Sequence, residues 1–364
     1  MRMLDQDRQR TLKTIQRLTD YNGPYNFYRM EVLYDYSISR MLAQGITDDA
    51  TMLQTILNEA IPGEKAGIDL SGFGCTAFKM MSTDGKWWMG RNYDFAQDTS
   101  AMLVHTPAKE NRFASVGFAA LSNLWINDPL EEGNVGALTA PFICLDGVNE
   151  NGVSIAVLTL DSSPVRQWDV GKQSISTSLA IRLVLDQAES AKHAVDLLHS
   201  YNMFAVGNRD YHFFITDATG NAYAVEYVFD AGGKRSFSAE QTVTTYGQCR
   251  ELEAMTNFFI HYIDKVQPNQ KNGIYGHGKE RYLKVLDVLD ENRGHCTRDT
   301  VWKALKATAQ LPGSSITSNT QWSIAYNNTD RTAEIAIRRD FGSKWRYDLK
   351  HNQIASVRGL MAEE

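Results

Sequence analysis

The sequence has little cysteine, and the cysteines it has are far apart. Only four occur among 364 residues, at Cys75, Cys144, Cys249 and Cys296, and no two form a C-x-x-C pair. This spacing excludes a zinc ribbon and a redox dithiol. A disulfide framework is not expected in a chain of this size without an export signal. Isolated thiols are mostly buried and inert, so a reactive one has to be argued from its neighbours.

Strong charge of one sign and long apolar runs are also absent. The formal net charge is -6 and no basic block occurs, which argues against nucleic acid as a partner. No apolar run is long enough to cross a bilayer, and residues 1–7 lack the apolar stretch of a secretory signal. We therefore expect a cytoplasmic protein that acts on a small molecule, without a cofactor or metal. The composition leaves a monomer and a homo-oligomer both open.

Local sequence patterns divide the chain at residue 74. Residues 1–62 are predicted to be helical, with apolar residues at helical spacing from Tyr28 to Leu42 and a cap before the helix that starts near Met52. Glycines interrupt 64–74, and strand-like composition begins at Cys75. Further helices are predicted at 178–185, 191–199, 279–291 and 298–309, and further strands at 154–160, 212–216, 222–227, 322–326 and 333–338. This order predicts an α+β domain in which helices cover two packed antiparallel sheets.

The clearest local motif is a hairpin around Asp84-Gly85, which is a strong turn signal between two strands. A hairpin brings Cys75, where the first strand begins, close to Arg91 and Asp94, where the second ends. A cation beside a thiol stabilises the thiolate, which is the nucleophilic form. A regular strand places Arg91 and Asp94 on opposite faces, so both reach Cys75 only if the strand ends or bulges between them. From the hairpin alone, a buried structural cysteine and a solvated Arg–Asp pair remain the alternative.

Three stretches together resemble the choloylglycine hydrolase and penicillin V acylase family: Cys75-Thr76, Gly90–Asp94 and Asp146–Gly152. Weaker matches follow at Phe214–Gly220 with Val225-Glu226, at Thr256-Asn257, and at Glu280–Tyr282. Their order and spacing cover nearly all of residues 75–340. The family consists of N-terminal-nucleophile hydrolases acting on linear amides. The resemblance therefore implies a four-layer αββα sandwich of two antiparallel sheets.

The resemblance also implies that Cys75 is the nucleophile. In the family this cysteine is the first residue of the mature chain, whereas here it is internal, so the Gly74–Cys75 bond has to be cut first. The junction Gly74-Cys75-Thr76 resembles that of self-processing relatives such as isopenicillin N acyltransferase and N-acylethanolamine acid amidase. Residues 1–74 then form a helical pro-segment and 75–364 the catalytic domain. Glycine suits the cleavage position because its backbone is permissive and leaves the carbonyl open to attack.

Roles for five further residues come from the same resemblance. Arg91 is expected to favour the thiolate, and Asp94 to orient the amine that cleavage frees. The side-chain amide of Asn257 and the backbone N–H of Thr159 are expected to bind the oxyanion, and Arg281 to support the site. Bile salt hydrolases have asparagine at the Thr159 position, a change that keeps the backbone donor but alters the side chain. The structural alternatives are a turn or cap role for Asn257 and a solvated helix position for Arg281.

These observations predict a cysteine amidase that hydrolyses a linear, non-peptide amide of an apolar acyl group. An acyltransferase shares the same acyl-enzyme, and a non-catalytic protein could use the fold to bind an acyl ligand, although the retained site residues argue against a binder. The loops at 96–140 and 161–175 do not distinguish bile salts, penicillins, N-acyl amino acids and N-acyl amines. Because this mechanism needs no histidine, His212 and His277 are predicted to be structural.

Overall fold

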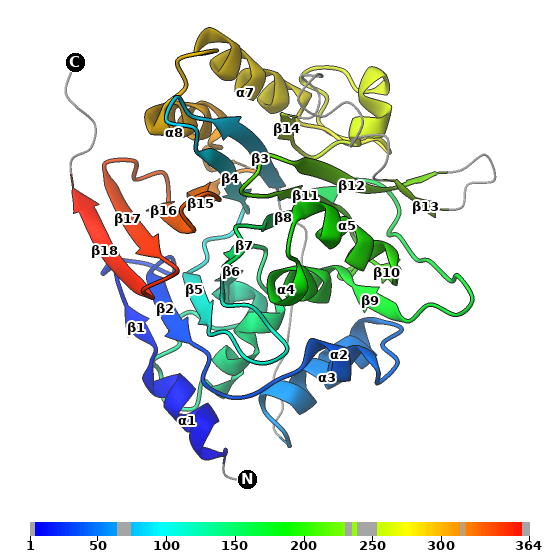
Figure 1. The fold of residues 1–364 in the computed structure, drawn as a ribbon, viewed down its shortest axis with the longest axis vertical. Coiled ribbons are helices and arrows are strands. Elements are labelled where there is room, and N and C mark those ends of the chain that lie inside the picture. The colour runs from blue at the N-terminus through cyan, green and yellow to red at the C-terminus, as the bar shows by residue number, and fades with distance from the viewer. Residues whose placement is uncertain are drawn as a thin grey trace.

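Two large β-sheets form the centre of the protein, and Figure 1 shows helices on their outer faces. The computed structural model describes residues 4–63, 74–229, 235–238, 253–313, 315 and 317–358. The first sheet has nine strands in the order β1-β2-β5-β6-β7-β8-β11-β12-β13 and the second has seven in the order β14-β3-β4-β15-β16-β17-β18. The sheets contact each other where β3 crosses β8 and β11. The predicted α+β sandwich is confirmed.

The nine-stranded sheet is antiparallel except for the β2–β5 pair. Its strands are β1 (Gln16–Arg17), β2 (Phe27–Glu31), β5 (Ala101–Thr106), β6 (Ser115–Ala120), β7 (Asp146–Asn149), β8 (Ser154–Leu160), β11 (Asp210–Thr216), β12 (Ala222–Phe229) and β13 (Arg235–Ser238). Those of the seven-stranded antiparallel sheet are β14 (Ala254–Met255), β3 (Gly74–Met81), β4 (Trp87–Asp94), β15 (Thr320–Asn327), β16 (Thr332–Ile337), β17 (Ser343–Asp348) and β18 (Gln353–Arg358). A small parallel pair consists of β9 (Ser174–Ser176) and β10 (Asn202–Phe204).

Two helix pairs supply the outer layers of the sandwich. Helices α4 (Thr177–Gln187) and α5 (Ala191–His199) cover the nine-stranded sheet, and α7 (Lys279–Glu291) and α8 (Arg298–Thr308) cover β3, β4 and β15. The remaining described helices are α1 (Gln6–Lys13), α2 (Ile38–Leu42), α3 (Asp49–Ala60) and the 3-10 helices η1 (Leu121–Leu124), η2 (Val135–Phe142) and η4 (Ile260–Lys265). Within the described ranges, no helix combines the length and apolar character needed to span a membrane.

Side-chain caps explain where several of these helices begin. The Asp48 carboxylate accepts the Thr51 N–H at 2.8 Å and starts α3, as the cap signal predicted. The Ser190 hydroxyl accepts the His193 N–H at 3.1 Å and starts α5 at the predicted residue. Each cap satisfies a backbone N–H that has no partner inside its helix.

The N-terminal segment is not purely helical, and the prediction of a helix from Tyr28 is wrong. Phe27–Glu31 forms β2, which pairs in parallel with β5 inside the nine-stranded sheet. Tyr28, Met30, Val32 and Tyr34 are fully buried. This is an alternation of period two, which favours a strand. Backbone hydrogen bonds to β5 stabilise the strand, and they outweigh the local helical spacing of the apolar residues.

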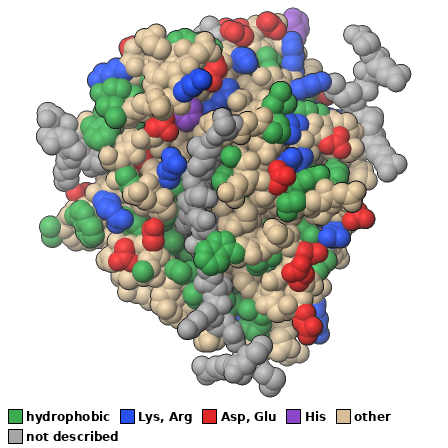
Figure 2. Space-filling model, turned by 180° about the vertical axis from the view of Figure 1, so that it is seen from behind, with side chains coloured by type: hydrophobic (Ala, Val, Ile, Leu, Met, Phe, Trp, Pro, Cys, Tyr) green, Lys and Arg blue, Asp and Glu red, His purple; other side chains and the backbone are tan. Residues whose placement is uncertain are grey.

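The outer surface carries charge of both signs. On the face shown in Figure 2, acidic and basic side chains are interspersed among polar and apolar ones. In the described part of this face, no extended area carries a single sign of charge. This surface pattern agrees with the small net charge of -6.

Met30→Ala tests whether β2 is part of the core. The side chain has no exposed surface, and truncating a buried methionine leaves a cavity, so the free energy of unfolding should fall by about 2–5 kcal/mol. Gln44→Ala, at an exposed position of the same segment, should change it by less than about 0.5 kcal/mol. Urea denaturation measures both. Equal small losses would contradict the packing described for β2.

Candidate active site

The β3–β4 hairpin sets the position of the candidate nucleophile. Cys75 lies opposite Tyr93 and Ala77 lies opposite Arg91, so the thiol and the guanidinium share the face turned toward the other sheet. Arg91 is fully buried there and donates to the Val157 carbonyl of β8 at 2.8 Å. The predicted meeting of thiol and guanidinium thus occurs between the two sheets.

The environment of Cys75 keeps the thiol protonated in the uncleaved chain. Its side chain has no exposed surface. Burial raises the pKa of the Cys75 thiol to about 12, although the charge of Arg91 and its hydrogen bond oppose this shift. Desolvation disfavours the thiolate by more than the nearby cation stabilises it. In the uncleaved chain, Arg91 is therefore the group that favours the thiolate against the effect of burial.

Asp94 lies on the opposite face of the hairpin, as its three-residue spacing from Arg91 predicts. It is the last residue of β4 and pairs with Gly74. Its Oδ1 accepts a hydrogen bond from Thr320 Oγ1 at 2.5 Å, and its Oδ2 lies 3.5 Å from Arg281 Nη1. Burial raises the pKa of the Asp94 carboxyl, and the Arg281 guanidinium opposes this. Among the described residues, no group donates a hydrogen bond to Asp94 Oδ2.

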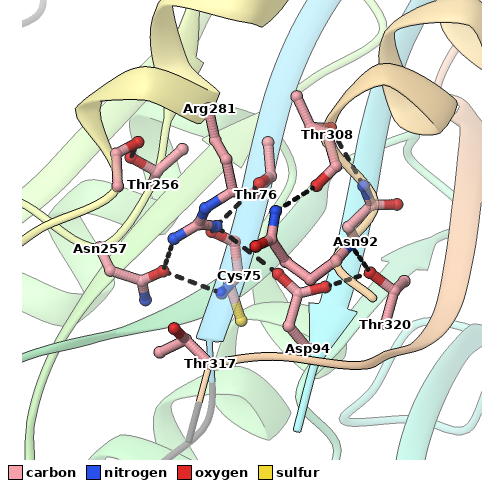
Figure 3. Close-up of polar contacts among 12 residues, drawn as sticks. Cys75, Thr76, Asn92, Asp94, Thr256, Asn257, Arg281, Thr308, Thr317 and Thr320 are labelled. Carbon is pink, nitrogen blue, oxygen red and sulfur yellow. Dashed lines mark hydrogen bonds and ion pairs between the residues drawn. The ribbon is translucent and has the colours of Figure 1, made fainter. Parts of the chain in front are cut away.

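Arg91 and Asp94 approach Cys75 from different sides because residues three apart in a regular strand lie on opposite faces of the sheet. The pairing of β4 with β15 is shifted between Thr320 and Trp322, at the Asp94 end of the strand. The Arg91 side chain meets the thiol, and the charge of Asp94 also influences the thiol. Figure 3 shows Asp94 near Cys75 and joined to Arg281 by an ion pair. The condition stated from the sequence, a strand end or a bulge between these two residues, is not met, because β4 pairs regularly with β3 through Asp94.

Asn257 links the main chain of Cys75 to the facing sheet. Its Oδ1 accepts the Cys75 N–H at 3.0 Å, and its Nδ2 donates to the Thr159 carbonyl at 2.8 Å and to Thr159 Oγ1 at 3.3 Å. Asn257 is fully buried. The structure thus brings together the two residues expected to bind an oxyanion. It also shows that the Asn257 amide is already oriented by contacts on both sides.

Arg281 occupies the centre of this network, as Figure 3 shows. One nitrogen, Nη1, donates to the Cys75 carbonyl at 2.6 Å and to Thr76 Oγ1 at 3.1 Å, and Nη2 donates to Asn257 Oδ1 at 2.7 Å. The residue projects from the first turn of α7 and is 2% exposed. The alternative of a solvated helix arginine is therefore wrong.

Two glycines make room for these contacts. A Cβ at Gly278, which has a φ of +85°, would lie 2.4 Å from Arg281 Nη2. A Cβ at Gly74 would lie 2.3 Å from the Cβ of Thr317. Glycine at position 74 thus has a packing reason in addition to the backbone freedom expected from the sequence.

The sequence reasoning gave no role to Asp146, which the structure places beside Arg91. Its Oδ2 lies 3.3 Å from Arg91 Nε and accepts from Trp322 Nε1 at 3.4 Å, and its Oδ1 accepts from the Tyr326 hydroxyl. All four residues are fully buried. Burial raises the pKa of the Asp146 carboxyl, and Arg91 opposes this. The sequence signal that could have indicated this role is a charged residue, Asp146, at the start of a short strand within the family motif.

The predicted structural histidine His212 is confirmed as a buried, fully bonded side chain. Its Nδ1 contacts Glu226 Oε1 at 2.9 Å and its Nε2 contacts the Thr256 carbonyl at 2.8 Å. Glu226 also accepts the Ile260 N–H at 2.8 Å. These bonds tie the chain on both sides of Asn257 to β11 and β12.

The layered arrangement of sheets and helices, compared with solved structures, identifies the fold class of this protein. The chain has the N-terminal-nucleophile hydrolase fold, which it shares with two solved structures. A mutant of the conjugated bile acid hydrolase from Clostridium perfringens aligns with a TM-score of 0.55 and 17% identity, over 78% of this chain and 97% of that one. Penicillin V acylase from Agrobacterium tumefaciens aligns with a TM-score of 0.51 and 16% identity, over 75% and 91%. No curated protein sequence matches this chain.

The sequence identifies the family within that class. The profile of the linear amide C-N hydrolases, choloylglycine hydrolase family, matches residues 75–265, which is more than half of the chain. This chain belongs to that family and is a hydrolase acting on linear amide C–N bonds. The match begins at Cys75.

Asp146→Ala tests the buried ion pair. Removing the carboxylate leaves the Arg91 charge buried without its partner, which should lower the free energy of unfolding by about 3–5 kcal/mol. Glu291→Ala removes the surface partner of Lys303 and should cost less than about 1 kcal/mol. Both values come from urea denaturation. If the two variants lose the same small amount, Arg91 does not depend on Asp146.

Proposed function

We propose that this chain is a cysteine N-terminal-nucleophile amidase that hydrolyses a linear amide of an apolar acyl group. Autocatalytic cleavage between Gly74 and Cys75 activates it, dividing the chain into a pro-segment, 1–74, and a catalytic domain, 75–364. The observation that carries this proposal is the set of acceptors at the Cys75 main chain. Asn257 Oδ1 already accepts the Cys75 N–H, and Asp94 lies alongside with an oxygen that has no hydrogen-bond donor among the described residues.

This arrangement suits an amine better than an amide. An amide nitrogen has one hydrogen to donate, whereas a free α-ammonium has three. Cleavage therefore creates new donors beside the buried Asp94 carboxylate, which can accept one at Oδ2. The positive charge of the new α-ammonium group also favours the ionised form of the Asp94 carboxylate. The site is thus better satisfied after cleavage than before it.

The cleavage step uses the same nucleophile as turnover. The Cys75 sulfur attacks the Gly74 carbonyl carbon, the C–N bond between the residues breaks, and the α-nitrogen takes a proton as the thiol loses one. Gly74 is then held as a thioester. Water hydrolyses it to the Gly74 carboxylate and regenerates the thiol. The packing of Gly74 against Thr317 supports this step, because a larger residue would clash with Thr317 and shift the backbone at the bond to be cut.

Cleavage supplies the base that the uncleaved chain lacks. An α-amine titrates near pH 7.7–8.0 and can take the proton of its own thiol at neutral pH. Arg91 then favours the thiolate that attacks the substrate carbonyl. The Asn257 side-chain amide and the Thr159 N–H donate to the developing oxyanion, and Arg281 holds the Cys75 carbonyl and Asn257 in position. Water releases the acid from the acyl-enzyme.

Cys75→Ala tests the nucleophile. The variant lacks the sulfur for both steps, so it should remain at full length on denaturing gels and should hydrolyse no amide. Cys296→Ala removes a thiol on the α7–α8 connection and should be cleaved and active like the wild type. Amide hydrolysis by Cys75→Ala would refute the proposal. Adding an amine acceptor to the wild-type assay distinguishes hydrolysis from acyl transfer, because only transfer gives a new amide.

The N-terminal segment should stay bound after cleavage. Strand β2 lies inside the nine-stranded sheet, the Tyr34 hydroxyl donates to the Leu138 carbonyl at 2.6 Å, and the Tyr36 hydroxyl donates to Asp186 Oδ1 at 2.9 Å. None of these bonds needs a covalent link at Gly74. Native size-exclusion chromatography should therefore show both fragments in one peak that only denaturant separates. An active catalytic fragment eluting without the segment would contradict this prediction.

A further inference from the structure

A second histidine, His277, forms a carboxylate–imidazole pair next to Asn257. His277 Nδ1 lies 2.8 Å from Asp161 Oδ2. The His277 N–H donates to the Asn257 carbonyl at 2.8 Å. His277 lies just before α7 and Asp161 just after β8, so the pair spans the two sheets as Asn257 and Thr159 do.

Three contacts therefore follow one another along β8 and the residue after it. Alternate residues of this stretch meet the opposite sheet: the Val157 carbonyl meets Arg91, Thr159 meets Asn257, and Asp161 meets His277. The first two contacts involve residues proposed for catalysis. The third contact, between Asp161 and His277, lies next to them along the same stretch of chain.

The order across the second sheet agrees with this row. Met255 pairs with Ala77 in β3, which places Asn257 beside Cys75, and Phe258 forms a bridge with Gly276. The segment that carries His277 therefore lies next to the segment that carries Asn257, on the side away from Cys75. Neighbouring strands in a sheet lie about 4.8 Å apart. A substrate whose carbonyl lies at Asn257 can therefore also contact His277.

One ring nitrogen of His277 has no hydrogen-bond partner in the described part of the chain. His277 is 8% exposed, and among the described residues nothing bonds to its buried Nε2. His212 differs, because both of its ring nitrogens are bonded. A buried polar atom without a partner is uncommon in folded proteins and calls for a reason. Beside a candidate active site, such an atom is placed to bind a polar group of a substrate.

We propose that His277, oriented by Asp161, binds the substrate. This inference rests on the amidase function proposed above. A carboxylate accepts a hydrogen bond from Nδ1–H, which leaves Nε2 of the neutral ring with its lone pair. Nε2 therefore accepts a hydrogen bond from a hydroxyl or N–H group of the substrate, close to the scissile carbonyl. The favoured substrates are linear amides that carry such a donor. This proposal differs from the sequence-based prediction of a purely structural His277.

Matched amides test this assignment at pH 8. The two amides of one pair share an acyl group and have a two-carbon amine that ends in a hydroxyl in one member and in a methyl in the other. A second pair shares its amine and differs by a hydroxyl or a methyl at the acyl α-carbon. Sites built to bind a hydroxyl discriminate strongly against analogues that lack it. In at least one pair, the wild-type kcat/KM should favour the hydroxyl member by about tenfold or more.

His277→Phe keeps the ring shape but removes the acceptor, so the preference should fall below about threefold. Asp161→Ala leaves the ring without its orienting partner and should also reduce the preference. His351→Phe is the matched control, because His351 forms the same kind of pair with Asp348 on the surface. It should leave the preference unchanged. The fraction cleaved at Gly74, measured by mass spectrometry, reports whether each variant is folded.

The outcomes separate this inference from the proposed function. Wild-type protein that hydrolyses no amide contradicts the amidase function. Wild-type protein that hydrolyses both members of each pair equally, or a preference that survives in His277→Phe, overturns the role of His277 alone. If His277→Phe does not fold, an unchanged preference in Asp161→Ala overturns it. A His277-dependent preference for an amide of glycine, whose carboxylate accepts hydrogen bonds, overturns the assignment of Nε2 as an acceptor.

Discussion

The candidate site depends on the buried guanidinium of Arg281. It donates to the Cys75 carbonyl and to Asn257 Oδ1 and lies beside Asp94. One planar group therefore fixes the main chain of the proposed nucleophile, the amide expected to bind an oxyanion, and the expected amine acceptor. A guanidinium can do this because it presents several donors in a fixed plane. Its charge is tolerated inside the protein because Asp94 neutralises it and oxygen atoms accept its hydrogen atoms.

A second arginine, Arg91, serves the opposite face of the same hairpin. It meets Asp146 and β8 between the sheets and lowers the pKa of the Cys75 thiol against the larger effect of burial. The two faces therefore divide the chemistry: the side chain of Cys75 faces Arg91, and its main chain faces Asn257 and Arg281. Such a division explains how one residue can supply a nucleophile on one side of the strand and, once its nitrogen is free, a base held from the other.

Local signals predicted the parts of the structure that short-range patterns control. The Asp-Gly turn placed Cys75 near Arg91, and caps at Asp48 and Ser190 marked helix starts that the structure confirms. Strand β2 was missed because its apolar residues fit both a helical and a period-two spacing, and the pairing that decides between them joins segments about seventy residues apart. Asp146 was missed for a similar reason. Its partner, Arg91, is distant in the sequence, and a lone aspartate is normally structural.

The central claim is that the working enzyme begins at Cys75, and the intact mass of catalytically active protein tests it most directly. The account predicts two polypeptides in the active fraction, one ending at Gly74 and one starting at Cys75 with an unmodified α-amine. The masses should add up to that of the full chain plus one water. Active protein that contains only the full-length chain would contradict the account, because the Cys75 nitrogen would still be an amide and could not act as the base.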